Sequence, residues 1–170
     1  MNVVRKKQKD QKIQDILFDI RKHEQVQKMK QFIQHGHVST YEHCEAVTSL
    51  SYEINKRLHL HADPDILLKG AMLHDFYLYD WHEKGDGTHR LHGFRHAEIA
   101  SRNAIQYLDM DEKICHVIRS HMWPLNPVKI PKIREAWIVC LADKCVSLHE
   151  TFFRRRKKGS QNNRKRTKST

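Results

Sequence analysis

The chain has 170 residues, enough for one domain with a sizeable core. Its formal net charge is +11, but residues 154–170 carry nine Lys or Arg and no acid, which leaves 22 basic against 20 acidic residues elsewhere. This distribution excludes a dedicated nucleic-acid-binding body. No apolar run reaches the length of a transmembrane segment, and the charged N-terminus lacks the apolar stretch of a signal peptide.

The first half of the chain has the apolar spacing of helices. Residues 10–33 form a loose helical stripe, which Gly36 interrupts. Ser39, with Glu42 three residues later, predicts a capping box at the start of a second helix. Asp63 and Pro64 predict the cap and first turn of a third helix, which ends near His74-Asp75.

The second half begins with residues 76–94, a loop rich in aromatic residues, His and Gly that we expect to form a wall or lid over a site. A fourth helix is predicted over residues 96–108. Asp111 starts a fifth helix with apolar residues at i, i+3 and i+4. Three prolines then form a rigid connection to a sixth helix over about residues 132–153. Strand signals are poor throughout, so an all-α fold is predicted.

The last segment, residues 154–170, is basic and contains no aromatic residue. We expect a disordered extension. The alternative is an electrostatic arm that makes weak, salt-sensitive contact with nucleic acid or an anionic surface. The four cysteines show no CxxC pairing. They are interpreted as reduced thiols of a cytoplasmic protein.

Six polar residues with metal-ligating side chains lie on the apolar side or at the end of a predicted helix, where a polar group without a partner would be costly. A shared metal centre is the simplest explanation. These residues are His43, His74, Asp75, His96, His121 and Asp143.

This ordered set resembles the HD-domain metal-dependent phosphohydrolase superfamily, an all-helical fold named for its His-Asp pair. The resemblance implies a single compact HD domain of about six helices over residues 38–153, after an N-terminal helical segment at residues 1–37. It also implies one ion held by His43, His74, Asp75 and Asp143. In two-ion members Asp75 would bridge to a second ion, with His96 and His121 as its further ligands.

The second ion is where alternatives remain open. Residues 96–100, His-Ala-Glu-Ile-Ala, resemble the family's His-Pro-Glu-Ile-Gly helix start, and the two substitutions leave His92 as an alternative ligand to His96. Some two-metal relatives have a His pair where this chain has His121-Met122. Mixed imidazole and carboxylate ligands suit Mn, Fe, Co, Ni or Zn.

The function implied by the resemblance is hydrolysis of a phosphomonoester, nucleotide or related small phosphate by a metal-bound hydroxide, with Asp75 at the catalytic centre. Arg95, Lys144, His82 and Trp81 are candidates for binding the substrate. The alternative is a non-catalytic HD-fold module that binds a nucleotide or associates with RNA. Oxygenase chemistry at a di-iron site also occurs among HD-fold relatives.

Overall fold

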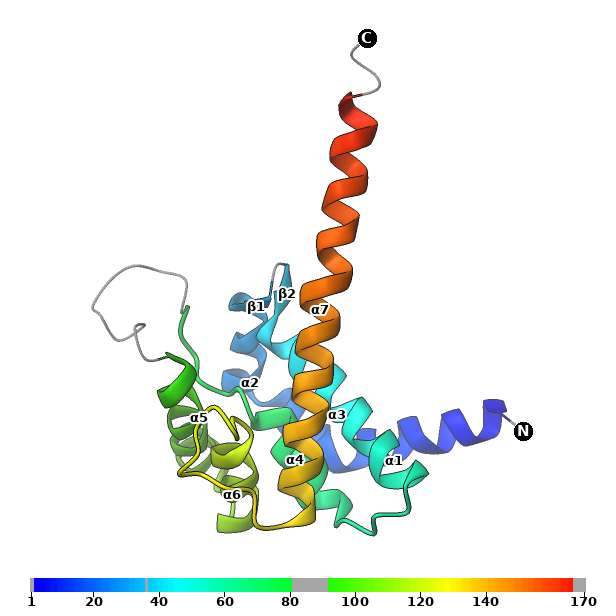
Figure 1. The fold of residues 1–170 in the computed structure, drawn as a ribbon. Helices are drawn as coiled ribbons and strands as arrows, with labels where there is room; N and C mark the ends of the chain where they lie inside the picture. Colours follow the sequence, from blue (N-terminus) through cyan, green and yellow to red (C-terminus); the bar gives the residue numbers. More distant parts are fainter. Residues whose placement is uncertain (1, 36, 81–91, 167–170) are drawn as a thin grey trace.

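The computed structural model describes the backbone of residues 2–35, 37–80 and 92–166 and the side chains of residues 11–34, 37–80 and 95–152. The described chain is mostly helical with little strand, which confirms the predicted all-α class (Figure 1). The helices are α1 (Asn2–Lys22), α2 (Glu24–Lys28), α3 (Thr40–Arg57), α4 (Pro64–Leu73), α5 (His92–Leu108), α6 (Glu112–Ser120) and α7 (Arg134–Arg166), with a single 3-10 turn, η1 (Met29–Gln31).

The N-terminal region differs from the single predicted helix over residues 10–33. His23 interrupts it, because its extended backbone and its ring nitrogen, which accepts from Gln25 N–H, cap the start of α2. A short antiparallel hairpin follows, β1 (Ile33–His35) with β2 (Val38–Ser39), in a segment whose sequence gives a poor strand signal. Strands of three and two residues are too short to show a period-2 pattern in sequence.

The predicted helix starts are confirmed where a cap defined them. Ser39 and Glu42 form both bonds of the capping box at α3, Asp63 caps α4 with Pro64 in its first turn, and Asp111 accepts from the Ile114 N–H at the start of α6. Two predicted helix boundaries, the start of one helix and the end of another, are wrong. α5 begins at His92 rather than residue 96, and α7 continues to Arg166 rather than ending near residue 153.

The basic end of the chain therefore continues α7 as far as Arg166 and projects away from the bundle (Figure 1). A helix that lacks tertiary packing is marginal in water. The disorder expected of residues 154–170 therefore stays a prediction. None of the described helices is both long and apolar enough to cross a membrane.

The core surrounds α4, which is buried on opposite sides. Leu68 and Met72 pack with α1, α5 and α6 in one apolar cluster. Leu67 and Ala71 pack with α3, α6 and α7 in a second cluster. A helix with apolar residues on opposite sides belongs inside a bundle, and α4 carries charge only in its early turns, at Asp65 and Lys69. Its C-terminal end, at His74-Asp75, consequently opens into the centre of the molecule rather than into solvent.

The N-terminal segment shares this core. Ile13, Leu17 and Ile20 of α1 belong to the same cluster as residues of α4 and α6. The backbone N–H of Thr40 donates to Phe32 O at 2.8 Å, which ties the residues before the hairpin to the start of α3. The hairpin is thus fixed beside the helix that carries His43.

Candidate metal centre

The six predicted ligands come from five segments of the bundle and are all buried. His43 lies in the second turn of α3, and His96 lies in α5. His74 and His121 are the C-cap residues of α4 and α6. Asp75 directly follows His74, and Asp143 lies in α7. Residues separated by up to a hundred positions therefore meet at one point.

One group of ligand atoms gathers on the Oδ2 side of Asp75. His74 Nε2 lies 3.4 Å from Asp75 Oδ2, and His43 Nε2 lies 3.9 Å from the same oxygen. Asp143 Oδ1 lies 3.2 Å from His43 Nε2 and 3.8 Å from His74 Nε2. These four residues are the set predicted for the first ion.

A second group gathers on the Oδ1 side of the same carboxylate. His96 Nε2 lies 3.3 Å and His121 Nε2 3.6 Å from Asp75 Oδ1. The two imidazole nitrogens are 3.0 Å apart. The ligand atoms of each trio, His43-His74-Asp75 and Asp75-His96-His121, lie within 4.8 Å of one another. Asp75 is the residue common to both trios.

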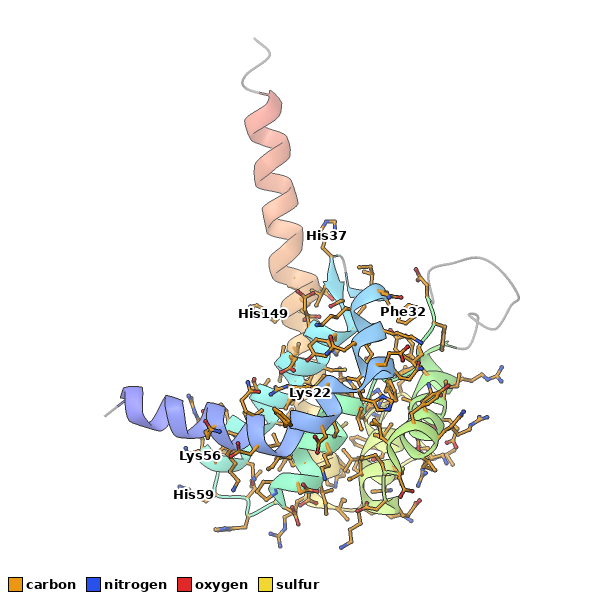
Figure 2. All side chains as sticks on the ribbon, turned by 180° about the vertical axis from the view of Figure 1, so that it is seen from behind. Lys22, Phe32, His37, Lys56, His59 and His149 are labelled. Carbon is orange, nitrogen blue, oxygen red and sulfur yellow. The ribbon has the colours of Figure 1, made fainter. Side chains whose placement is uncertain are left out.

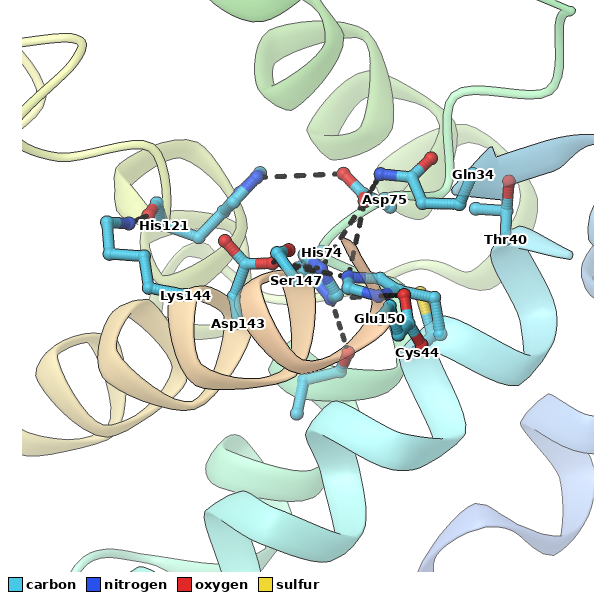
Figure 3. Close-up of polar contacts among 12 residues, drawn as sticks. Gln34, Thr40, Cys44, His74, Asp75, His121, Asp143, Lys144, Ser147 and Glu150 are labelled. Carbon is cyan, nitrogen blue, oxygen red and sulfur yellow. Dashed lines mark hydrogen bonds and ion pairs between the residues drawn. The ribbon is translucent and has the colours of Figure 1, made fainter. Parts of the chain in front are cut away.

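The helix ends fix the histidine tautomers. His74 Nδ1 donates to Ala71 O at 2.7 Å, and His121 Nδ1 donates to Ile118 O at 2.7 Å (Figure 3 shows both rings). Each ring thereby satisfies a carbonyl left without a partner at a helix C-terminus. Each Nε2 is left facing Asp75 with its lone pair available, the arrangement that a metal ligand requires.

Two atoms at the centre have no hydrogen-bond partner among the described residues although both are buried: His74 Nε2 and Asp75 Oδ1. Leaving a buried polar group unsatisfied costs about 1–3 kcal/mol, and more for a charged group. A cation that accepts both lone pairs would remove this cost. The orphaned atoms and the mixed donor set therefore fit a divalent transition metal.

The electrostatics favour ionised carboxylates and a neutral His121. Burial alone would raise the pKa of Asp75, but the surrounding His74, His96 and His121 lower that pKa well below its usual range. Asp143 behaves in the same way, its pKa being lowered mainly by its hydrogen bond with His43. Burial and the neighbouring His74 lower the pKa of His121 to about 3, so its imidazole is uncharged at neutral pH.

His43 differs from the other histidines. Burial lowers its pKa, but hydrogen bonds with Asp143 and Glu150 outweigh burial and raise the pKa to about 10. The ring is therefore held as an imidazolium between two carboxylates in the metal-free protein. This position attracts a positive charge, which a proton or a metal ion can supply.

Sequence reasoning missed several residues that support the ligands. Glu150 Oε2 lies 3.1 Å from His43 Nδ1, and Ser147 Oγ donates to Asp143 Oδ1 at 3.2 Å. Both follow Asp143 on one face of α7, at i+4 and i+7, as Figure 3 shows. That spacing was a usable signal. Cys44 is a buried core residue whose Sγ also lies 3.7 Å from His74 Nδ1.

The predicted substrate-binding residues fall into different places. His82 and Trp81 lie outside the described residues, as does the side chain of the alternative ligand His92. Lys144 donates from Nζ to His121 O at 2.9 Å and to Cys140 O at 3.3 Å. Arg95 is exposed and lines a surface groove of about 230 Å³ between α5 and the end of α6.

Other histidines lie away from the centre. His37, His59 and His149 are exposed and point outward from the surface (Figure 2). Neither His23 nor His61 has a ligand atom in either trio. The described histidines that meet Asp75 are therefore the four that the sequence pattern selected.

A model of the family described as "HD domain" matches residues 40–148. The match includes all six ligands and lies within the predicted range 38–153. Comparisons with curated proteins and with solved structures find no match.

Proposed function

The chain belongs to the HD-domain family, and on this premise we propose that it is a metal-dependent phosphohydrolase that cleaves a phosphomonoester, nucleotide or related small phosphate. The observation that carries the proposal is the position of Asp75, whose two oxygens each face two buried histidines. We propose that this carboxylate bridges two ions.

We propose that the six ligands form two sets, one for each of two cations. His43, His74 and Asp143 would hold one ion with Asp75 Oδ2, and His96 and His121 would hold the other with Asp75 Oδ1. Bound divalent ions of this class lower the pKa of coordinated water and neutralise phosphate oxygens. Glu150 accepts from His43 Nδ1, which orients that ring and makes it a more basic ligand.

Substrate recognition is proposed to involve Arg95 more than Lys144. The Lys144 ammonium group is already bonded to two backbone carbonyls, so we propose that it holds the end of α6 and thereby His121. Arg95 is exposed one residue before His96, with its guanidinium close enough to influence Tyr79. A phosphate is the natural partner of such a group. Trp81 and His82 remain proposals from sequence.

Two further proposals concern the surroundings of the protein. We propose the reducing cytoplasm as its compartment, because all four cysteines are free and three are buried. The basic residues 154–170 are proposed to make weak contact with a polyanion, nucleic acid included, through charge alone.

The presence of all six buried ligands supports an enzyme over the non-catalytic alternative.

The test is phosphate release by the full chain, loaded with Mn²⁺, from a panel of nucleotides and generic phosphate esters. Asp75→Asn keeps the size of the side chain but removes its charge, and we expect loss of activity and of at least one bound ion. His59→Asn is the matched control, because His59 is exposed and its left-handed backbone, with φ of 50°, suits Asn.

Two results would count against the enzyme. If no substrate releases phosphate with Mn, Fe, Co, Ni or Zn while a nucleotide still binds Asp75→Asn, the protein is a binding module. Substrate-dependent oxygen uptake by the iron-loaded protein would instead indicate oxygenase chemistry.

A further inference from the structure

Gln34 lies in β1, before residue 40 where the family match begins, and reaches the centre of the site. Its side chain is buried, and Figure 3 shows it extending from the strand toward Asp75. The Gln34 amide Nε2 donates to Asp75 Oδ2 at 2.6 Å. A hydrogen bond to an ionised carboxylate is about twice as strong as a neutral one.

Asp75 and Tyr77 together fix the orientation of the Gln34 amide. The Tyr77 hydroxyl donates to Gln34 Oε1 and lies 3.2 Å from Thr40 Oγ1. If the amide were flipped, its oxygen would face the Asp75 carboxylate and its NH₂ would face the tyrosine. Because the ionised Asp75 carboxylate can only accept, it selects the orientation in which the NH₂ faces it, and the bond from Tyr77 then holds Oε1 in place.

The hairpin anchors Gln34 to the bundle. Ile33 pairs with Ser39 across the two strands, and Ser39 also caps α3. Because α3 carries His43, the strand that presents Gln34 and the helix that presents a ligand are joined at one point. The amide is thus fixed relative to the ligands, because a paired strand carries it and not a free loop.

We propose that Gln34 is a positioning residue of the metal centre, which holds the Asp75 carboxylate so that Oδ2 faces His43 and His74 while Oδ1 faces His96 and His121. Oδ2 has two lone pairs, one for the amide and one for an ion. The inference rests on the proposed two-ion site, and it adds a contribution from the N-terminal segment.

Loss of the amide affects the two ions unequally. Without Gln34 the carboxylate can turn about its Cβ–Cγ bond, and the bridge is weakened. Apart from Asp75, the first ion keeps three ligands, His43, His74 and Asp143, whereas the second keeps two, His96 and His121. Partners behind metal ligands typically contribute about 10–100-fold in affinity. We expect that loss at the ion held by His96 and His121.

The experiment compares the full chain with Gln34→Met, which keeps the length of the side chain and removes its donor. Mn²⁺ titration gives the affinity and stoichiometry of each ion, and electron paramagnetic resonance reports whether two Mn²⁺ ions are coupled through a bridge. Gln31→Met is the matched control, since Gln31 is exposed three residues earlier. We expect Gln34→Met to bind one ion normally and the second about 10–100-fold more weakly, with the coupled signal lost.

The outcomes separate the two proposals. A wild-type chain that binds fewer than two Mn²⁺ ions overturns both the two-ion centre and this inference. Two coupled ions in the wild type and equally in Gln34→Met overturn the inference alone, even if the variant melts at a lower temperature. If Gln34→Met does not fold, Tyr77→Phe decides: a smaller loss in the same direction supports the inference, and wild-type behaviour overturns it.

Discussion

At Gly70, α4 lies in close contact with Val117 of α6, one turn before the metal ligands His74 and His121. A Cβ atom at this position would lie 2.6 Å from Val117 Cγ1 and 2.9 Å from Val117 Cβ, against about 3.5–4.0 Å for a favourable carbon contact. Val117 is fully buried, and a β-branched residue in a helix has one strongly preferred χ1 rotamer. Since Val117 cannot turn aside, Gly70→Ala must push the two helices apart.

The cost follows from two opposing effects. Alanine is favoured over glycine in a helix by about 1 kcal/mol. Overpacking a filled core costs about 1–3 kcal/mol, and a contact this short belongs at the upper end of that range. We expect Gly70→Ala to lower the free energy of unfolding by about 1–2 kcal/mol.

Gly70→Ala should also weaken metal binding. His74 and His121 each lie four residues, about one turn, beyond Gly70 and Val117 on the same helix faces. Their ring centroids are 4.9 Å apart. Separating α4 from α6 therefore separates the two groups of ligands, and we expect weaker binding of the second Mn²⁺ ion.

Urea unfolding of the metal-free protein measures the first effect, for Gly70→Ala, Val117→Ala and the double variant. Val117→Ala alone removes buried methyl groups and is destabilising. In the double variant the new alanine at residue 70 occupies the space that Val117 vacates, so its cost should be smaller than the sum by about 0.5–3 kcal/mol. A Gly70→Ala protein as stable as wild type, or strictly additive effects, would refute the reasoning.

Three further predictions address the site and the tail. Chelation should lower stability, since each ion present at 100 times its Kd adds about 2.7 kcal/mol, and thermal unfolding that EDTA leaves unchanged would argue against a metal centre. Glu150→Gln should weaken the ion at His43 by about 10-fold in Mn²⁺ titration, whereas Glu53→Gln, on the outer part of α3, should not; equal effects would contradict a specific role for Glu150. A chain ending at residue 153 should keep its metal stoichiometry and lose salt-dependent binding to a polyanion. Unchanged polyanion binding would show that residues 154–170 do not make this contact.

Features set by neighbouring residues were predictable. Ser39 with Glu42, Asp63 with Pro64, and Asp111 each define a helix start, because a cap bonds to backbone groups two or three residues away. The start of α5 was predicted four residues late, because the sequence has no proline near residue 92 and Leu91 is not a residue type that caps helices. The hairpin was missed because its strands are too short to show a period.

The sequence by itself determined which side chains are candidate ligands, since a His or Asp on an apolar helix face requires a partner. It also placed His74 and Asp75 at a helix end. Only the tertiary structure decided which histidines face which oxygen of Asp75, and that Gln34 and Glu150 stand behind the ligands. Those contacts join residues 41 and 107 positions apart. The i+7 spacing places Glu150 on the same face of α7 as Asp143, but no local periodicity encodes the contacts with His43 and Asp75 themselves, because these are set by how distant segments pack against one another.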